Sequence, residues 1–169
     1  MSAELLVEET RSLLLDEIKA NIDAALTAIR NERNDPIVST EPPISYFIFA
    51  PSNILRCPAV IIVVDSADIP EETTGANHIN GVVSIFVSVV VEDREADLLT
   101  IKAERYQAAL FRILHRKTLQ DAVKNVKIYS RVRKLNYSPI YTTKAEDPMG
   151  EFRKEVVLEL TVKHFENPN

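Results

Sequence analysis

The chain has 169 residues, of which 46% are hydrophobic and 27% are charged, and its formal net charge is −5. A chain of this length is expected to fold as one domain around a single core. No apolar run approaches the roughly 20 residues that span a bilayer, and the acidic N-terminus has the wrong sign for a secretory or transit peptide. We therefore expect no membrane partner. The single cysteine, Cys57, excludes an internal disulfide and favours a reducing, cytoplasmic setting.

The first expected element is an amphipathic helix over residues 3–33. Apolar residues recur there at three- and four-residue steps and fill an arc of roughly 100°: Leu15, Ile18, Ile22, Ala25, Leu26 and Ile29. Pro36 predicts the end of the helix, since proline disfavours the α conformation in the residue before it. Leu5, Leu6 and Leu13 lie off the apolar stripe. They indicate either a second packing neighbour within the chain or a contact between subunits.

Three strands are expected after a proline-rich connector, at residues 44–50, 59–65 and 81–93. The second is apolar on both faces, which is typical of a central strand. The third alternates cleanly. Val83 through Val91 supply a uniformly apolar face for the core, whereas Ser84, Phe86 and Ser88 lie on a half-polar face that suits partial cover or an interface. Residues 66–80 are expected to form a loop.

A second helix is expected from about residue 95 to residue 117. Leu99, Ala103, Tyr106, Leu110 and Ile113 form its apolar stripe. A separate basic stripe lies about 110° away at 100° per residue and consists of Lys102, Arg105, Arg112 and Arg116. The acids Glu92, Asp93, Glu95 and Asp97 stand at the helix start, where they suit the helix dipole.

Two further strands are expected at 126–137 and 153–166, joined by residues 138–152, which lack clear periodicity. A connection of that length in a compact domain is usually functional or mobile. The order of elements predicts an α+β fold: a mainly antiparallel sheet of about four to five strands flanked by two long helices, in one domain over residues 1–169.

Charge is concentrated in one block, because residues 105–134 carry nine bases and one acid in an otherwise acidic chain. Such a block can face nucleic acid, face an acidic patch on a neighbouring copy, or be simply solvated. Tyr129, Arg131 and Arg133 alternate and would share one strand face, as in a stacking platform for single-stranded nucleic acid. The competing interpretation is that both arginines pair with acids of a neighbouring strand or subunit.

The sequence offers no catalytic, cofactor-binding or metal-binding residues that we can assign, and we do not expect an enzyme. Its three glycines, Gly75, Gly81 and Gly150, cannot form a phosphate-cradling loop. Its three histidines lack the spacing of metal ligands. Cys57 precedes Pro58 at the start of an apolar strand, where a small buried hydrophobe is its usual role.

The order of elements does resemble a known family. An amphipathic helix is followed by strands that end in the valine-rich stretch 82–91, then by an acidic turn into a helix that reads AERYQAALFRIL, and finally by a hairpin-like pair. Over most of its length the chain resembles the tail terminator and related tail-completion, or head–tail neck, proteins of long-tailed bacteriophages.

This resemblance implies a structural protein of the virion tail or neck that is assembled in the host cytoplasm. Members form homo-oligomeric rings, typically hexamers, that cap the tail tube, end its polymerisation and join the tail to the head connector. DNA passes through the lumen without specific binding. In that setting the subunit interface is expected at Arg105, Arg112, Arg116, Arg131, Arg133 and Phe86. Contacts with the tail tube or connector are expected at Tyr141, Lys144, Glu146 and Asp147. The alternative function is a nucleic-acid-binding module that uses the basic 105–134 block.

Overall fold

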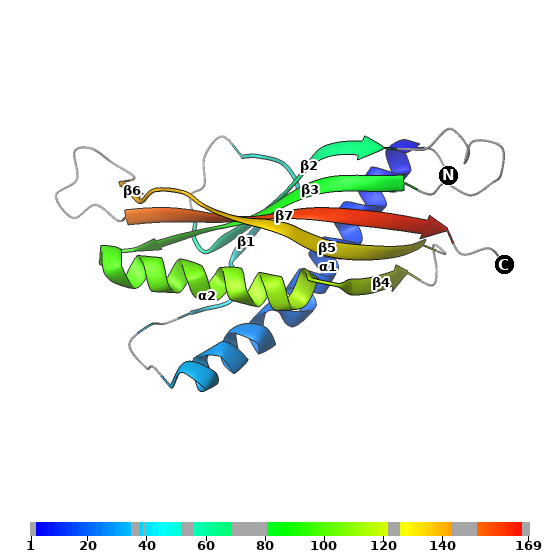
Figure 1. The fold of residues 1–169 in the computed structure, drawn as a ribbon. Helices are drawn as coiled ribbons and strands as arrows, with labels where there is room; N and C mark the ends of the chain where they lie inside the picture. The colour runs from blue at the N-terminus through cyan, green and yellow to red at the C-terminus, as the bar shows by residue number, and fades with distance from the viewer. Residues whose placement is uncertain are drawn as a thin grey trace.

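The computed structural model describes residues 3–34, 38, 40–51, 56–68, 81–121, 126–142 and 152–166. These residues form two long helices and one seven-stranded sheet (Figure 1). The helices are α1 (Ala3–Arg33) and α2 (Ala96–Leu114). The strands are β1 (Ser45–Phe47), β2 (Ala59–Asp68), β3 (Gly81–Asp93), β4 (Lys117–Asp121), β5 (Val126–Tyr137), β6 (Tyr141–Thr142) and β7 (Phe152–Glu166).

The sheet is mixed, with the strand order β1-β2-β3-β7-β5-β4 and β6 paired with β7. Only β1 and β2 are parallel among the described strand pairs, and the others are antiparallel. The expected α+β class and mainly antiparallel pairing are therefore present, but the count of four to five strands is wrong. The two missed strands are β4 and β6. The start of β4 follows α2 after only two residues, and Arg116 makes the turn with a φ of 55°.

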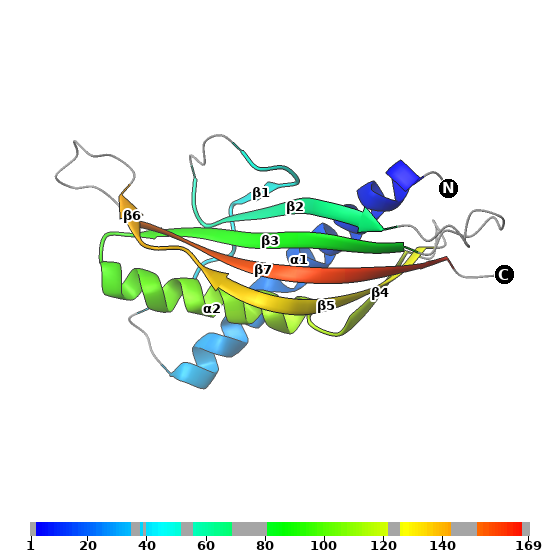
Figure 2. The ribbon, with the colours of Figure 1, turned by 45° about the horizontal axis from the view of Figure 1, so that its top comes forward.

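Both helices cover the same face of the sheet (Figure 2). The covering follows from the alternation in β3: Val83, Ile85 and Val87 are at most 1% exposed, whereas Val82, Ser84 and Phe86 are half-buried. Helix α2 packs on β3 and β7, and α1 packs on α2 and contacts β2 and β4. One sheet face thus builds the main core. No described helix packs on the other face, although Ser88 and Val90 of β3 and Ile61 of β2 are buried on it.

The core includes α1 over nearly its whole length, from Leu6 to Ile29. Leu6 is fully buried, so the off-stripe position reflects packing within the chain rather than an exposed contact. Leu13 is partly buried against the same core, and the side chain of Leu5 lies outside the described part. Strand β2 continues to Asp68 instead of ending at residue 65. The rest of the expected loop, residues 69–80, lies outside the described residues.

Candidate interaction surfaces

An open apolar groove of about 380 Å³ lies between α2 and the end of β5. Its lining residues are Glu104, Gln107, Ala108, Phe111, Arg112, Leu135 and Tyr137. We call it the α2–β5 groove. Leu135 is 39% and Tyr137 is 54% exposed, although both carry large apolar groups. An apolar concave surface of this kind is typical of a binding site for a ligand or partner.

A bulge in β5 creates this groove. The pairing with β7 shifts between Val132 and Lys134, so that Leu135 lies opposite Leu158. Leu158 belongs to the helix-covered face of β7. The extra residue therefore turns Leu135 toward α2, where it lines the groove and remains 39% exposed. The α2 side of the groove is completed by Phe111, whose ring stacks on His115 at a centroid distance of 4.4 Å.

A second apolar surface lies at the opposite edge of the sheet, on the segment that contains β1. Ile44, Ile48 and Phe49 are 60%, 43% and 60% exposed, and we call them the β1 patch. The patch is held in place from two sides. The Nη1 of Arg11 donates to the Ile48 carbonyl at 3.2 Å, and the ring of Phe49 packs edge-to-face on Phe47 at 5.9 Å. Side chains of α1 and β1 thus contact the patch at Ile48 and Phe49.

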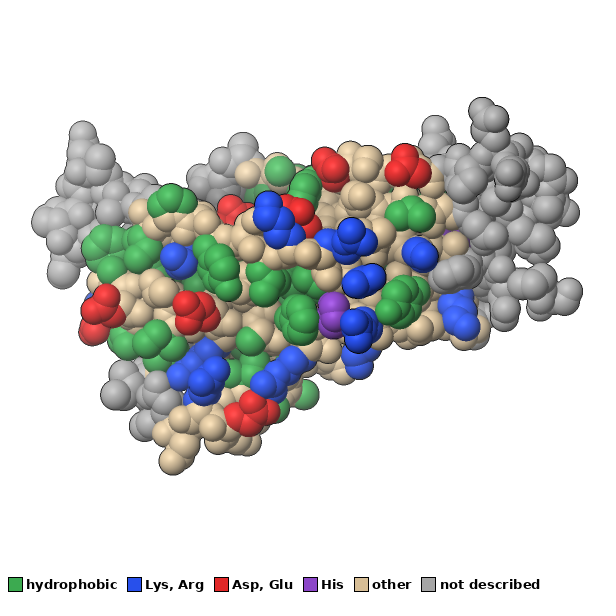
Figure 3. Space-filling view, viewed as in Figure 1, with side chains coloured by type: hydrophobic (Ala, Val, Ile, Leu, Met, Phe, Trp, Pro, Cys, Tyr) green, Lys and Arg blue, Asp and Glu red, His purple; other side chains and the backbone are tan. Residues whose placement is uncertain are grey.

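The uncovered sheet face carries basic side chains on its β5–β7 half. Lys127, Arg131 and Lys163 are exposed there and make no ion pair with any described residue. Figure 3 shows several lysine and arginine side chains close together on the side of the molecule toward β4, with others elsewhere on the same face. The expected alternation of Arg131 with Arg133 is wrong, because the bulge falls between Val132 and Lys134 and leaves Arg133 out of the pairing.

Lys134 occupies the position on the uncovered face of β5 that simple alternation predicts for Arg133. Its Nζ lies 3.7 Å from the Glu159 carboxylate, which also accepts a hydrogen bond of 2.6 Å from the Asn136 amide. Phe86 lies opposite Glu159 on the same uncovered face and is half-buried. This agrees with its expected position outside the main core and leaves its role at a subunit interface a prediction.

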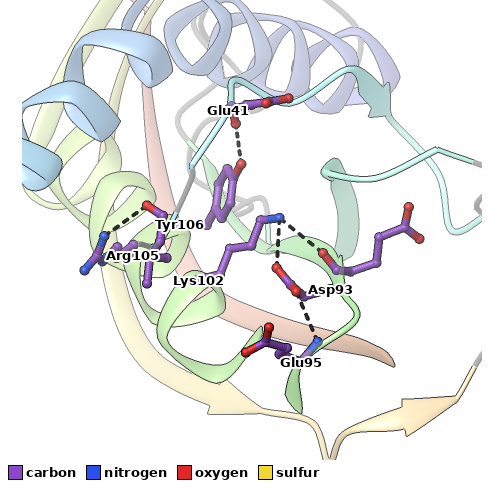
Figure 4. A network of polar contacts seen from close by, with 8 residues as sticks. Glu41, Asp93, Glu95, Lys102, Arg105 and Tyr106 are labelled. Carbon is purple, nitrogen blue, oxygen red and sulfur yellow. Dashed lines mark hydrogen bonds and ion pairs between the residues drawn. The ribbon is translucent and has the colours of Figure 1, made fainter. Parts of the chain in front are cut away.

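Arg105 is the clearest correction, since it was expected on an exposed stripe and is only 6% exposed. Its Nη1 donates to the Val38 carbonyl at 3.3 Å. Two further side chains contact the same chain segment between α1 and β1. Arg30 donates to the Thr40 carbonyl at 2.8 Å. The Tyr106 hydroxyl donates to the Glu41 carbonyl (Figure 4). The three side chains donate to carbonyls of the segment between α1 and β1.

Tyr106 is fully buried in the core, as expected. Burial raises the pKa of its phenol, and the nearby Glu41 charge raises it further. The hydroxyl therefore stays protonated and serves as a hydrogen-bond donor. Lys102 also departs from the exposed stripe. Its Nζ reaches the Glu92 carbonyl at 3.2 Å and the Asp93 carboxylate at 3.6 Å, and it joins the start of α2 to the end of β3 (Figure 4).

Arg112 is exposed, as expected, but has a partner within the chain. Its guanidinium donates to both carboxylate oxygens of Glu32 at 2.8 and 2.6 Å, which ties α2 to the end of α1. The hydrogen bond from Arg112 holds the pKa of Glu32 below its usual value and outweighs the opposing effect of desolvation. Arg112, which the sequence predicts at a contact with a neighbouring copy, thus has its charge neutralised within its own chain.

The remaining expected contacts are only partly described. Arg116 is exposed at the turn between α2 and β4. The backbone of Tyr141 pairs with Arg153 in the short strand β6. Lys144, Glu146 and Asp147 lie outside the described residues. Among the residues that are described, no group of three potential ligands forms a metal site, and no helix is long and apolar enough to cross a membrane.

The described residues form an α+β fold with both helices on one face of the sheet and two separate apolar surfaces. No protein-family model and no curated protein matches the sequence. Among solved structures, the chain is similar to one described as the virion of a native gene transfer agent (GTA) particle. The sequence identity is 14% and the TM-score is 0.34, and the match covers 86% of this chain and 94% of that chain. A likeness of this extent assigns neither a family nor a function.

Proposed function

We propose that the protein is a virion structural protein that assembles head to tail into a ring. The observation that carries this proposal is the pair of exposed apolar surfaces at opposite edges of the sheet, the β1 patch and the α2–β5 groove. A head-to-tail interface requires two different surfaces on one subunit, and it closes into a ring when the rotation between copies permits. A two-fold dimer would need only one self-complementary surface.

The family resemblance described above suggests the particular role. In this proposal the ring, a hexamer, caps the tail tube of a phage-like particle and ends its polymerisation. It also joins the tail to the head connector, and DNA passes through its lumen. The tail tube protein and the connector protein are then its partners, and the virion tail or neck is its location.

Electron microscopy and native mass spectrometry of the purified protein test the ring. The expected result is particles of one diameter with a mass of six subunits. Adding the protein to its polymerising tail tube protein is expected to stop tube growth and leave a visible cap at one end. A chain that stays monomeric at its highest soluble concentration and leaves tube length unchanged would contradict the proposal.

A second candidate function is nucleic-acid binding on the uncovered sheet face. The three exposed cations Lys127, Arg131 and Lys163, with Tyr129 opposite Lys163, favour it. Binding through phosphate contacts weakens linearly in log–log plots against salt, with a slope of roughly −0.7 for each contact to a single strand. A titration of the protein with a single-stranded oligonucleotide should therefore give a slope near −2, and loss of about one third of it in Arg131→Gln. A slope near zero would exclude this function.

A further inference from the structure

We propose that neighbouring copies associate through opposite edges of their sheets, with the β1 patch of one copy seated in the α2–β5 groove of the next. The inference rests on the proposed function and names the interface of the ring. Both surfaces are apolar and exposed, and both include an aromatic ring: Phe49 in the patch and Phe111 in the groove. Aromatic anchors that fill apolar pockets supply much of the binding energy of protein interfaces.

The β1 patch and the α2–β5 groove lie at the same position along the strand direction. The register can be followed across the sheet from Phe47 at the end of β1 to Ile61, Ser88, Val157 and finally Asn136 in β5. Asn136 lies between Leu135 and Tyr137, the two β5 residues of the groove. A copy placed beside the sheet in the same orientation therefore presents its β1 patch level with the groove. Figure 2 shows β1 and β5 on opposite sides of the β3–β7 pair.

The same lateral placement brings opposite charges together. Strand β1 covers only residues 59–61 of β2, and β4 covers only residues 126–130 of β5. Beyond the residues that β1 covers, β2 carries the exposed Asp65, which lies between Val64 and Ser66. Through the pairing with β3 and β7, Val64 aligns with Val132 of β5, and Ser66 aligns with Arg131. An acidic edge segment of one copy thus meets the exposed Arg131 and Arg133 of the next. Complementary charge of this kind sets orientation and disfavours wrong pairings.

Both free edge segments contain a bulge, between Val64 and Ser66 in β2 and between Val132 and Lys134 in β5. Bulges at edges interrupt the backbone ladder and discourage open-ended strand pairing. The contact between copies is therefore made by side chains, not by a continuous sheet. This geometry suits a ring that closes at a fixed number of copies and does not grow as a fibre.

Two variants that each damage one surface test the interface. Phe49→Asp removes the patch and Leu135→Asp removes the groove, and both positions are exposed enough to tolerate the change. Each variant alone is expected to sediment as a monomer, with its association weakened at least about 30-fold. Ile101→Asp is the matched control, because Ile101 is 40% exposed on α2 and lies outside the groove. It should assemble as the unchanged protein does, and circular dichroism should show all three variants folded.

Mixing the two damaged variants gives the decisive result. Leu135→Asp keeps an intact patch and Phe49→Asp keeps an intact groove, so an equal mixture should form a one-to-one dimer and stop there. Native mass spectrometry distinguishes the two chains by mass. Rings that survive in either variant, a mixture that remains monomeric, or a control that also loses assembly would overturn the interface. If both variants still form rings and still cap tubes, the proposed interface is wrong and the proposed function stands. If the mixed variants form the one-to-one dimer but the unchanged protein never caps tubes, the interface stands and the proposed function is wrong.

Discussion

Adjacent residues of β3 lie on opposite faces of the sheet and differ in how deeply they are buried. Ile85 and Val87 lie under the helices and are at most 1% exposed, whereas Phe86, between them, lies on the uncovered face and is half-buried. Burial of apolar side chains stabilises the fold roughly in proportion to the area removed from water. The helix-covered face therefore contributes most of the stability of the fold. The uncovered face is buried only in part: Ser84 and Phe86 are half-buried there, whereas Ser88 and Val90 are buried.

The largest loss of stability is expected for Tyr106→Ala, in the core under the helix-covered face. Removal of a fully buried aromatic ring typically costs about 3–5 kcal/mol of unfolding free energy, and Tyr106 also donates to the Glu41 carbonyl. Urea unfolding followed by circular dichroism measures the loss. Tyr106→Phe is the control, because it keeps the ring and removes only a hydrogen bond worth about 1 kcal/mol. Equal losses in both variants would show that the hydrogen bond, not the packing, is decisive.

A comparison of Ile85→Ala with Phe86→Ala tests the two faces directly. Ile85 is 1% exposed in the core, and such truncations cost about 2–5 kcal/mol. Phe86 is the larger side chain, yet its replacement should cost less because it is only half-buried. Unfolding midpoints in urea give both values. A greater loss for Phe86→Ala would mean that the uncovered face contributes as much to the stability of the fold as the helix-covered face.

A smaller effect is expected when the arginines of α2 are compared. Arg105→Ala leaves the buried Val38 carbonyl without this donor, and an unpaired buried polar group costs about 1–3 kcal/mol. Arg112→Ala removes a pair that lies in solvent on both sides and should change stability less. Thermal unfolding in low and high salt separates them, since salt screens the exposed pair but not the buried contact. An exposed Arg105 would give the reverse order.

The smallest expected effect is on the titration of Glu32. Arg112 lowers the pKa of this carboxyl, so its contribution to stability is present above the usual carboxyl pKa and is lost as the pH falls through the lowered value. Arg112→Gln should raise the pKa of Glu32 toward its usual value in a carbon-detected NMR titration. Arg105→Gln should leave it unchanged. An unaltered pKa in Arg112→Gln would show that the pair does not persist in solution.

The elements were predictable where periodicity is strong and local. The bounds of α1, β3 and β5 follow from their apolar patterns, and the buried stripe of α2 was expected correctly at Leu99, Ala103 and Tyr106. Strand β4 was missed, because Lys117 suits the end of a helix and no glycine or proline marks the turn before it. The exposed position of Arg105 was wrong because its partner, Val38, lies 67 residues away in the chain. A helical wheel contains no such neighbour.

The candidate surfaces were harder to predict than the elements. The bulge beside Val132 changes which side chains of β5 face α2, and the sequence around it has no feature that marks an inserted residue. The β1 patch had a weak signal, since Ile48 and Phe49 continue an apolar run beyond the strand that uses it. The expected strand over residues 44–50 spread these residues over both faces. Only the short observed strand, Ser45–Phe47, shows that they project from an edge.

The central place of β7 has a consequence for the timing of folding. It is the last of the described strands in chain order, yet it lies between β3 and β5 and pairs with both. A nascent chain that emerges from the ribosome holds the N-terminal strands of the sheet but lacks the strand that joins its two halves. The complete sheet can therefore form only after β7 has been synthesised, and folding is slow where contacts between residues far apart in sequence dominate. Truncated translation products therefore cannot present the two sheet edges in register, and incomplete chains are kept out of any assembly that depends on both.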